Sequence, residues 1–152
     1  MNRALTALDK RILNRLQQDI PFTAEPWKKI AGELNIQEAR LLNRIAILKK
    51  RGIIRRIAAV FNPRKVGFVS TLAAAKVAPE NIEAAARAVN KYPEVTHNYK
   101  RQEEYNLWFA LVAPSRKKIT LIINRLKKNK KFKKVIELPA VRLFKIDVSL
   151  KV

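Results

Sequence analysis

The chain has 152 residues, a length that suits one compact domain or two small ones, and its hydrophobic fraction of 48% is sufficient for a folded core. Charge is its unusual feature, because 33 lysines and arginines stand against 12 acids and give a formal net charge of +21. Such an excess favours polyanionic partners: nucleic acid, an acidic membrane or a small molecule with many carboxylates. The lack of cysteine excludes disulfides, thiolate catalysis and cysteine-based metal sites, and the single histidine, His97, excludes a His-rich metal cage built by one chain.

No apolar run reaches the roughly 20 residues that a membrane span needs, and the first residues lack the apolar core of a signal peptide. We therefore expect a soluble, cytoplasmic protein.

The first third of the chain has the pattern of consecutive short helices. Thr6 and Asp9 have the spacing of a capping box, and apolar residues then recur at helical spacing to a helix end near Ile20. A second, short helix is expected over about 27–34.

A third helix is predicted to open at Asn35, which has Glu38 at cap spacing, and to end before Gly52. The alternating residues 53–61 then predict a strand. Three helices and a following strand predict a winged helix-turn-helix domain over residues 1–62.

A DNA-binding helix of this kind presents polar side chains from its first turn. Gln37 and Arg40 are suitable, but Glu38 would be repelled by phosphate. The architecture permits DNA binding, and the residues give it little support.

Residues 63–152 alternate between strand and helix patterns. The expected elements are a strand over 68–77, a helix over 82–89, strands over 95–99 and 105–113, a basic helix, and a last strand or strands over 135–148, interrupted at Pro139. This βαββαβ order predicts a ferredoxin-like domain, and with it an α+β chain. The open face of such a sheet is a common place for a ligand or a partner subunit.

Residues 116–134 are the most basic stretch, with ten cations and no acid. Ile119, Ile122, Ile123 and Leu126 have the spacing of an amphipathic helix. Two readings of the lysines stay open: a solvated outer face or a phosphate-binding patch.

Strand alternation places Val95, His97 and Tyr99 on one face of the sheet, and Thr96, Asn98 and Lys100 on the other. A lone histidine on a strand is more commonly structural than chemical. Phenol hydroxyls, which can act as weak acids, and cationic and aromatic groups nevertheless lie near this histidine in the sequence. They belong to Tyr99, Lys100, Arg101, Tyr105 and Trp108.

Several stretches of the sequence resemble one family over essentially the whole chain. Leu8–Leu13 and Gly52–Arg55 resemble the opening helix and the wing of the Lrp/AsnC regulators. The more specific stretches resemble the siroheme decarboxylases, a branch that kept the regulator fold and became an enzyme of alternative heme and heme d1 synthesis. They are Pro21–Phe22 with Pro26–Ala31, Ile54–Asn62, Val95–Tyr99 through Glu104–Phe109, and Leu138–Ile146.

The resemblance implies loss of carbon dioxide from two acetate side chains of siroheme, which gives 12,18-didecarboxysiroheme. It also implies an A-type subunit with a homologous B-type partner, and no separate cofactor, since the substrate carries the iron. One departure is Pro63, which stands where many relatives have a histidine. Any chemistry of that histidine must then come from the partner or be dispensable.

The chemistry so implied needs groups that hold a polyacid and a group that supplies a proton. Arginine binds carboxylates bidentately, so Arg55 and Arg56 are candidates, although a DNA-backbone contact inherited from the wing is the alternative. His97 is the candidate proton donor, because imidazole titrates near neutral pH; an axial ligand to the siroheme iron and a partner for a carboxylate are its other possible roles.

The remaining candidates support these groups. Tyr99 and Tyr105 are hydrogen-bond donors to acetates, and Trp108 offers an aromatic surface to the macrocycle or is simply a core residue. The supporting cations are Lys65, Lys100 and Arg101.

Two other functions fit the same fold. A DNA-binding regulator of the Lrp/AsnC type explains the fold and the charge but not the stretch from His97 to Phe109. A heme-sensing or partner-binding module would use the same pocket without turnover.

Overall fold

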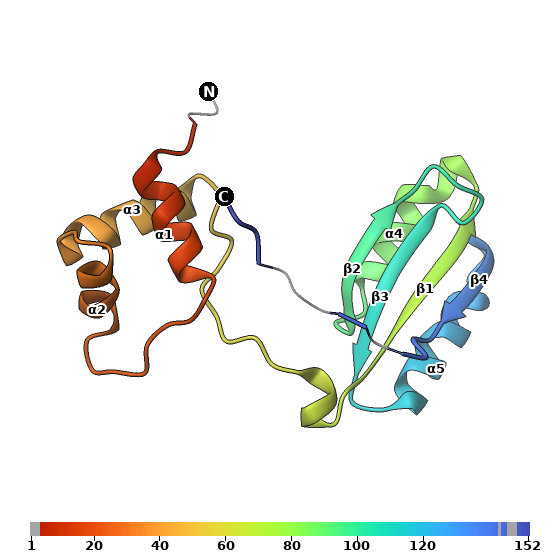
Figure 1. The fold of residues 1–152 in the computed structure, drawn as a ribbon. Helices are drawn as coiled ribbons and strands as arrows, with labels where there is room; N and C mark the ends of the chain where they lie inside the picture. The colour runs from red at the N-terminus through yellow and green to blue at the C-terminus, as the bar shows by residue number, and fades with distance from the viewer. Residues whose placement is uncertain (1–3, 143, 146–148) are drawn as a thin grey trace. The chain divides into compact units, whose positions relative to one another are not determined.

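The computed structural model describes residues 4–142, 144–145 and 149–152 (Figure 1). The chain forms two compact units, Met1–Ala59 with Lys145–Val152, and Val60–Phe144. The C-terminal residues thus group with the first unit, whereas the sequence suggests a single boundary after residue 62. Each unit has its own hydrophobic core.

The first unit contains the three expected helices, α1 (Ala7–Leu16), α2 (Pro26–Glu33) and α3 (Glu38–Lys50). Helix α1 is shorter than the sequence suggests, since it ends at Leu16 and not near Ile20. Their apolar faces meet in a core made of Ile12, Ile30, Ala31, Leu34, Leu41, Ile45 and Leu48.

The capping box of α1 is confirmed. The backbone N–H of Asp9 donates to Thr6 Oγ1 over 3.1 Å, and the N–H of Thr6 donates to Asp9 Oδ2 over 2.9 Å. The same carboxylate is fully buried and forms a salt bridge with Arg44 of α3, whose Nη2 lies 2.7 Å from Asp9 Oδ1. Asp9 therefore caps one helix and joins it to another.

Asn35 does not open α3, contrary to the expectation. It has a left-handed backbone (φ 52°), and its N–H donates to Gly32 O while that of Ile36 donates to Ala31 O. This pattern is a Schellman motif that ends α2, a role that asparagine tolerates because it enters the left-handed region more readily than most residues. Gly52 (φ 71°) ends α3 in the same way, as predicted.

The strand expected over 53–61 was wrong. Residues 55–62 have no regular structure, and all of their side chains are exposed. A strand is defined by backbone pairing, and within the described residues no other segment pairs with this one. Alternation alone therefore predicted an element that lacks a partner in the isolated chain.

The C-terminal residues 149–152 lie along α1. The amide of Asn14 donates to Val152 O (3.0 Å) and accepts from its N–H (3.1 Å). The side-chain amide of Gln17 likewise donates to Leu150 O (2.8 Å) and accepts from the N–H of Leu150 (2.6 Å). Two side-chain amides one helical turn apart thus pair with alternate residues of an extended segment.

The second unit confirms the βαββαβ prediction. After a 3-10 turn (Pro63–Val66), its elements are β1 (Val69–Val77), α4 (Ile82–Asn90), β2 (Val95–Lys100), β3 (Leu107–Ala113), α5 (Arg116–Lys127) and β4 (Phe132–Leu138). The strands form one antiparallel sheet in the order β2-β3-β1-β4. The described residues after Pro139 form no further strand.

Helices α4 and α5 cover one face of this sheet, and no other helix among the described residues of this unit covers the opposite face (Figure 1). Buried residues from the covered face and from both helices make the core, with Phe109, Leu111, Ile119 and Ile122 at its centre. None of the helices in the described part of the chain is both long and apolar enough to cross a membrane.

Candidate functional site on the open sheet face

A bulge at Thr96 sets which β2 side chains reach the open face. Val95 pairs with Leu111, and the next pair is His97 with Ala110, so Thr96 is left outside the ladder. Leu111 is buried beneath the helices, so Val95 lies on the covered face. The expectation that Val95 shares a face with His97 and Tyr99 was therefore wrong, while His97 and Tyr99 do share one.

The strand register brings the open-face residues into rows across the sheet. One row consists of His97, Ala110, Leu72 and Leu138, and the next consists of Tyr99, Trp108, Ala74 and Ile136. Adjacent strands are about 4.8 Å apart, so each row spans about 14 Å. The result is a mainly apolar face with a fully buried Ala74 and a half-buried Ala110 near its centre and with aromatic rings toward β2.

His97 is exposed on this surface and is oriented by two neighbours. Its Nδ1 lies 3.1 Å from Thr96 Oγ1, and its ring stacks on that of Tyr99 with 6.0 Å between centroids and 24° between planes. Its other ring nitrogen, Nε2, has no hydrogen-bond partner among the described residues. That nitrogen is thus available to a ligand above the sheet.

The other aromatic groups are held by the turn between β2 and β3. The guanidinium of Arg101 lies over the Tyr99 ring, 6.0 Å from its centroid. The indole N–H of Trp108 donates to Tyr105 O over 2.6 Å, which fixes the half-buried Trp108 opposite Tyr99.

Asn106 anchors this turn to the neighbouring strand, a role that the sequence did not indicate. Its amide donates to Val77 O (2.8 Å) and accepts from Val77 N–H (3.0 Å), as a paired strand residue would. The backbone carbonyl of Asn106 accepts from the backbone N–H of Arg101 (2.9 Å). These bonds position Arg101 and Tyr105 at the end of the open face.

The sequence also did not predict a group of charged residues at the end of the sheet near the turn between β2 and β3. Lys76 of β1 stands directly opposite Lys134 of β4, and its Nζ lies 2.9 Å from Glu104 Oε1. The hydrogen bond from Lys76, aided by the charge of Lys134, holds the pKa of Glu104 below its usual value, and the same hydrogen bond raises the pKa of Lys76. Alternation along β1 places Lys76 with Leu72 and Ala74, but only the strand register reveals its partner.

Four predicted site residues lie outside the rows of the open face, two of them in the other unit. Lys100 pairs with the buried Leu107, so its register position belongs to the helix-covered side. Lys65 lies exposed in the 3-10 turn before β1. Arg55 and Arg56 are exposed in the first unit.

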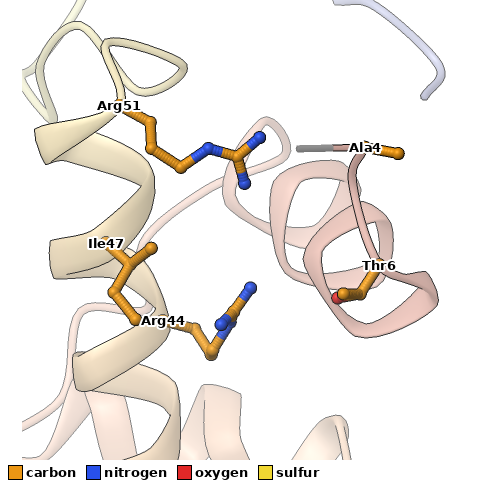
Figure 2. A pocket seen from close by; sticks show the side chains of 5 residues that line it. All are labelled: Ala4, Thr6, Arg44, Ile47 and Arg51. Atoms are coloured by element: carbon orange, nitrogen blue, oxygen red, sulfur yellow. The ribbon is translucent and has the colours of Figure 1, made fainter. Parts of the chain in front are cut away.

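The first unit contains a cavity of about 310 Å³ between the start of α1 and α3 (Figure 2). Figure 2 shows Arg44 and Arg51 extending from α3 toward Ala4 and Thr6. The charge of Arg44 is already paired with that of Asp9. No group of three or more metal-ligating side chains of the His, Cys, Asp or Glu type occurs among the described residues.

The fold and a family model show which class of protein this chain belongs to. Residues 65–145 match the family model of the AsnC-like ligand binding domain. The structure superimposes on that of Escherichia coli AsnC with a TM-score of 0.83 over 99% of this chain and 100% of that one, at 17% identity, which shows a shared fold. The chain is thus an AsnC-like protein, with a helix-turn-helix unit and a ligand-binding-type unit.

Closer relatives narrow the class. Residues 9–55 match the siroheme decarboxylase NirDL-like helix-turn-helix domain. The chain is 38% identical over 147 residues to the siroheme decarboxylase alpha subunit of Desulfovibrio desulfuricans, which covers 97% of this chain and 84% of that protein. It is 35% identical to the siroheme decarboxylase NirDL crystallised in co-complex with an iron-uroporphyrin III analogue, with a TM-score of 0.68 over 94% of this chain and 47% of that one. The chain belongs to the siroheme decarboxylase family, which is a family of enzymes.

Proposed function

We propose that this chain is the A-type subunit of an enzyme that removes carbon dioxide from two acetate side chains of siroheme. The similarity to a siroheme decarboxylase alpha subunit over nearly the full length of both chains carries this proposal. The word subunit in that name supports a homologous B-type partner. The iron-uroporphyrin analogue bound by a related enzyme supports a substrate that carries its own iron. The proposed reaction requires no separate cofactor.

The reaction sets two tasks for the protein. Loss of carbon dioxide from an acetate leaves an electron pair on the methylene carbon, which the tetrapyrrole ring delocalises. That carbon must then gain a proton to become a methyl group. The protein therefore has to hold a flat polyacid in one orientation and deliver a proton to a carbon at its edge.

The open sheet face suits the first task. Trp108 and Tyr99 offer aromatic surface beside the partly exposed Ala110, whose small side chain leaves room for a flat ring. Arg101 lies at the border of this surface, where its guanidinium is available to a carboxylate. Arg55, Arg56, Lys65 and Lys100 stay candidates for other carboxylates.

His97 and the tyrosines suit the second task. The contact between Nδ1 and Thr96 Oγ1 leaves Nε2 of His97 facing a ligand, and a protonated Nε2 is a proton donor. Tyr99 stacks beside it and Tyr105 lies at the adjacent turn, so both hydroxyls are available to hold the reacting acetate. Coordination of the substrate iron by Nε2 is the alternative role for the same nitrogen.

The test is direct. The purified chain, alone and mixed with a homologous B-type subunit, is incubated anaerobically with siroheme, and the product masses are measured. We expect stepwise loss of carbon dioxide, strongest in the mixture. Unchanged siroheme in every combination would refute the proposal.

A DNA-binding regulator is the second candidate, and its support is the fold shared with AsnC at 17% identity. It requires sequence-dependent DNA binding that survives physiological salt. Weak, salt-sensitive binding would reflect only the net charge of +21.

A further inference from the structure

Two lysines face each other at the end of the open sheet face. Lys76 and Lys134 are directly paired in the register of β1 and β4, and like charges in this position destabilise a sheet. Beyond Lys76 the register shifts, so the pair lies at the last regular position before the bulge. An anion between or above the two side chains relieves this repulsion.

Glu104 is the anion that this structure supplies. Its carboxylate lies 2.9 Å from Lys76 Nζ and is also influenced by Lys134. The carboxylate belongs to the exposed turn before β3, and its side chain is 68% exposed. One exposed carboxylate thus stands against two cations, which leaves a net positive charge at this position.

These charges border the surface proposed to hold the macrocycle. Lys76 lies two residues after Ala74 on β1, and Lys134 lies two residues before Ile136 on the antiparallel β4. The two lysines therefore form the next row of the open face, about 7 Å along the sheet. Arg101 lies at the same end of the sheet, above Tyr99. An apolar surface bordered by cations is complementary to a flat ring bordered by carboxylates.

We propose that Lys76 and Lys134 bind carboxylates along one edge of the tetrapyrrole substrate, and that Glu104 occupies this position until the substrate displaces it. The identity of the ligand rests on the proposed function. The exchange is a carboxylate of the substrate for a carboxylate of the protein, so the two lysines keep a counter-ion in both states. Glu104 is then a competitor for the site and also keeps other anions out.

The test measures binding without turnover. Iron uroporphyrin III, which carries carboxylates on every pyrrole, is titrated into the full chain in a Trp27→Phe background, so that Trp108 is the only tryptophan left to report binding by quenching. We expect Lys76→Gln and Lys134→Gln each to raise the Kd about tenfold, as for loss of one charged hydrogen bond. Higher salt should reduce the difference between each variant and the parent.

The direction of the Kd change in Glu104→Gln decides between competition and a purely structural role for Glu104. If Glu104 only stabilises the turn through Lys76, its removal leaves binding unchanged or weaker. If it competes with the substrate, its removal lowers the Kd severalfold. Lys117→Gln is the matched control, since this exposed lysine of α5 lies on the helical layer that covers the opposite face.

The outcomes separate this inference from the proposed function. Kd values of the two lysine variants within twofold of the parent, or an unchanged or higher Kd for Glu104→Gln, overturn the inference even if siroheme is decarboxylated. The expected Kd changes without any decarboxylation sustain the carboxylate site and refute the enzyme assignment. Circular dichroism of each variant verifies that the sheet is intact.

Discussion

Arg44 of α3 donates to both carboxylate oxygens of Asp9 at the start of α1, with Nη2 2.7 Å from Oδ1 and 2.8 Å from Oδ2. Asp9 is fully buried, whereas the Arg44 side chain is 26% exposed. The same carboxylate accepts from the N–H of Thr6 and so completes the capping box. One buried charge thus serves helix initiation and helix packing together.

Removal of this carboxylate should destabilise the first unit strongly. Asp9→Ala leaves Arg44 without its partner and the α1 N-terminus without its cap, and we expect a loss of about 3 kcal/mol, near the low end for a broken buried pair because Arg44 keeps some solvent. Thermal unfolding followed by circular dichroism measures it. The control is Asp19→Ala, which removes an exposed partner of Arg15 and should cost about 0.5 kcal/mol or less. Equal effects of the two substitutions would contradict this account.

The same pair predicts how stability depends on pH. Burial alone would raise the pKa of Asp9, but the hydrogen bonds from Arg44 and Thr6 outweigh it and hold the pKa below its ordinary value. A lowered folded-state pKa means that the stabilisation is complete above the unfolded-state value of about 3.9 and is lost as pH falls through the folded-state value. Between about pH 5 and the acid limit, the parent should therefore lose stability more steeply than Asp9→Asn. Parallel curves of unfolding free energy against pH for the two proteins would refute the assignment.

His97 variants should separate its possible roles. If His97 delivers the proton, His97→Ala lowers kcat by about 10²-fold or more, while the visible spectrum of bound siroheme stays that of the parent. If Nε2 is an axial ligand, the spectrum changes as well. Thr96→Val is the companion variant, because it removes the oxygen beside Nδ1 and keeps the imidazole itself. Full turnover by His97→Ala would exclude His97 from the chemistry.

Much of the fold follows from local sequence signals. Thr6 and Asp9 predicted the start of α1, and Gly52 predicted the end of α3, because each signal acts within one helical turn. The shared face of His97 and Tyr99 also follows from alternation over two residues. These predictions depend on neighbours in the chain, and the structure confirms them.

What the sequence does not reveal depends on contacts between distant segments. The bulge at Thr96 moves Val95 to the other face, and no local signal marks it. The pairing of Lys76 with Lys134 requires the register of β1 and β4, which are more than 50 residues apart in the chain. Asn106 likewise acts through the backbone of Val77. The site's framework was therefore only partly predictable.

The C-terminal residues offer a last prediction. Asn14 and Gln17 each form two hydrogen bonds with the backbone of residues 150–152, so the double variant Asn14→Ala, Gln17→Ala removes all four. Since a typical hydrogen bond contributes about 1 kcal/mol net, we expect the amides of Leu150 and Val152 to exchange with solvent at least tenfold faster. Hydrogen–deuterium exchange measures this. Gln18→Ala is the matched control, because the hydrogen bond of Gln18 is made by its backbone to Arg15. Unchanged exchange at both amides in the double variant would show that α1 does not hold this segment in solution.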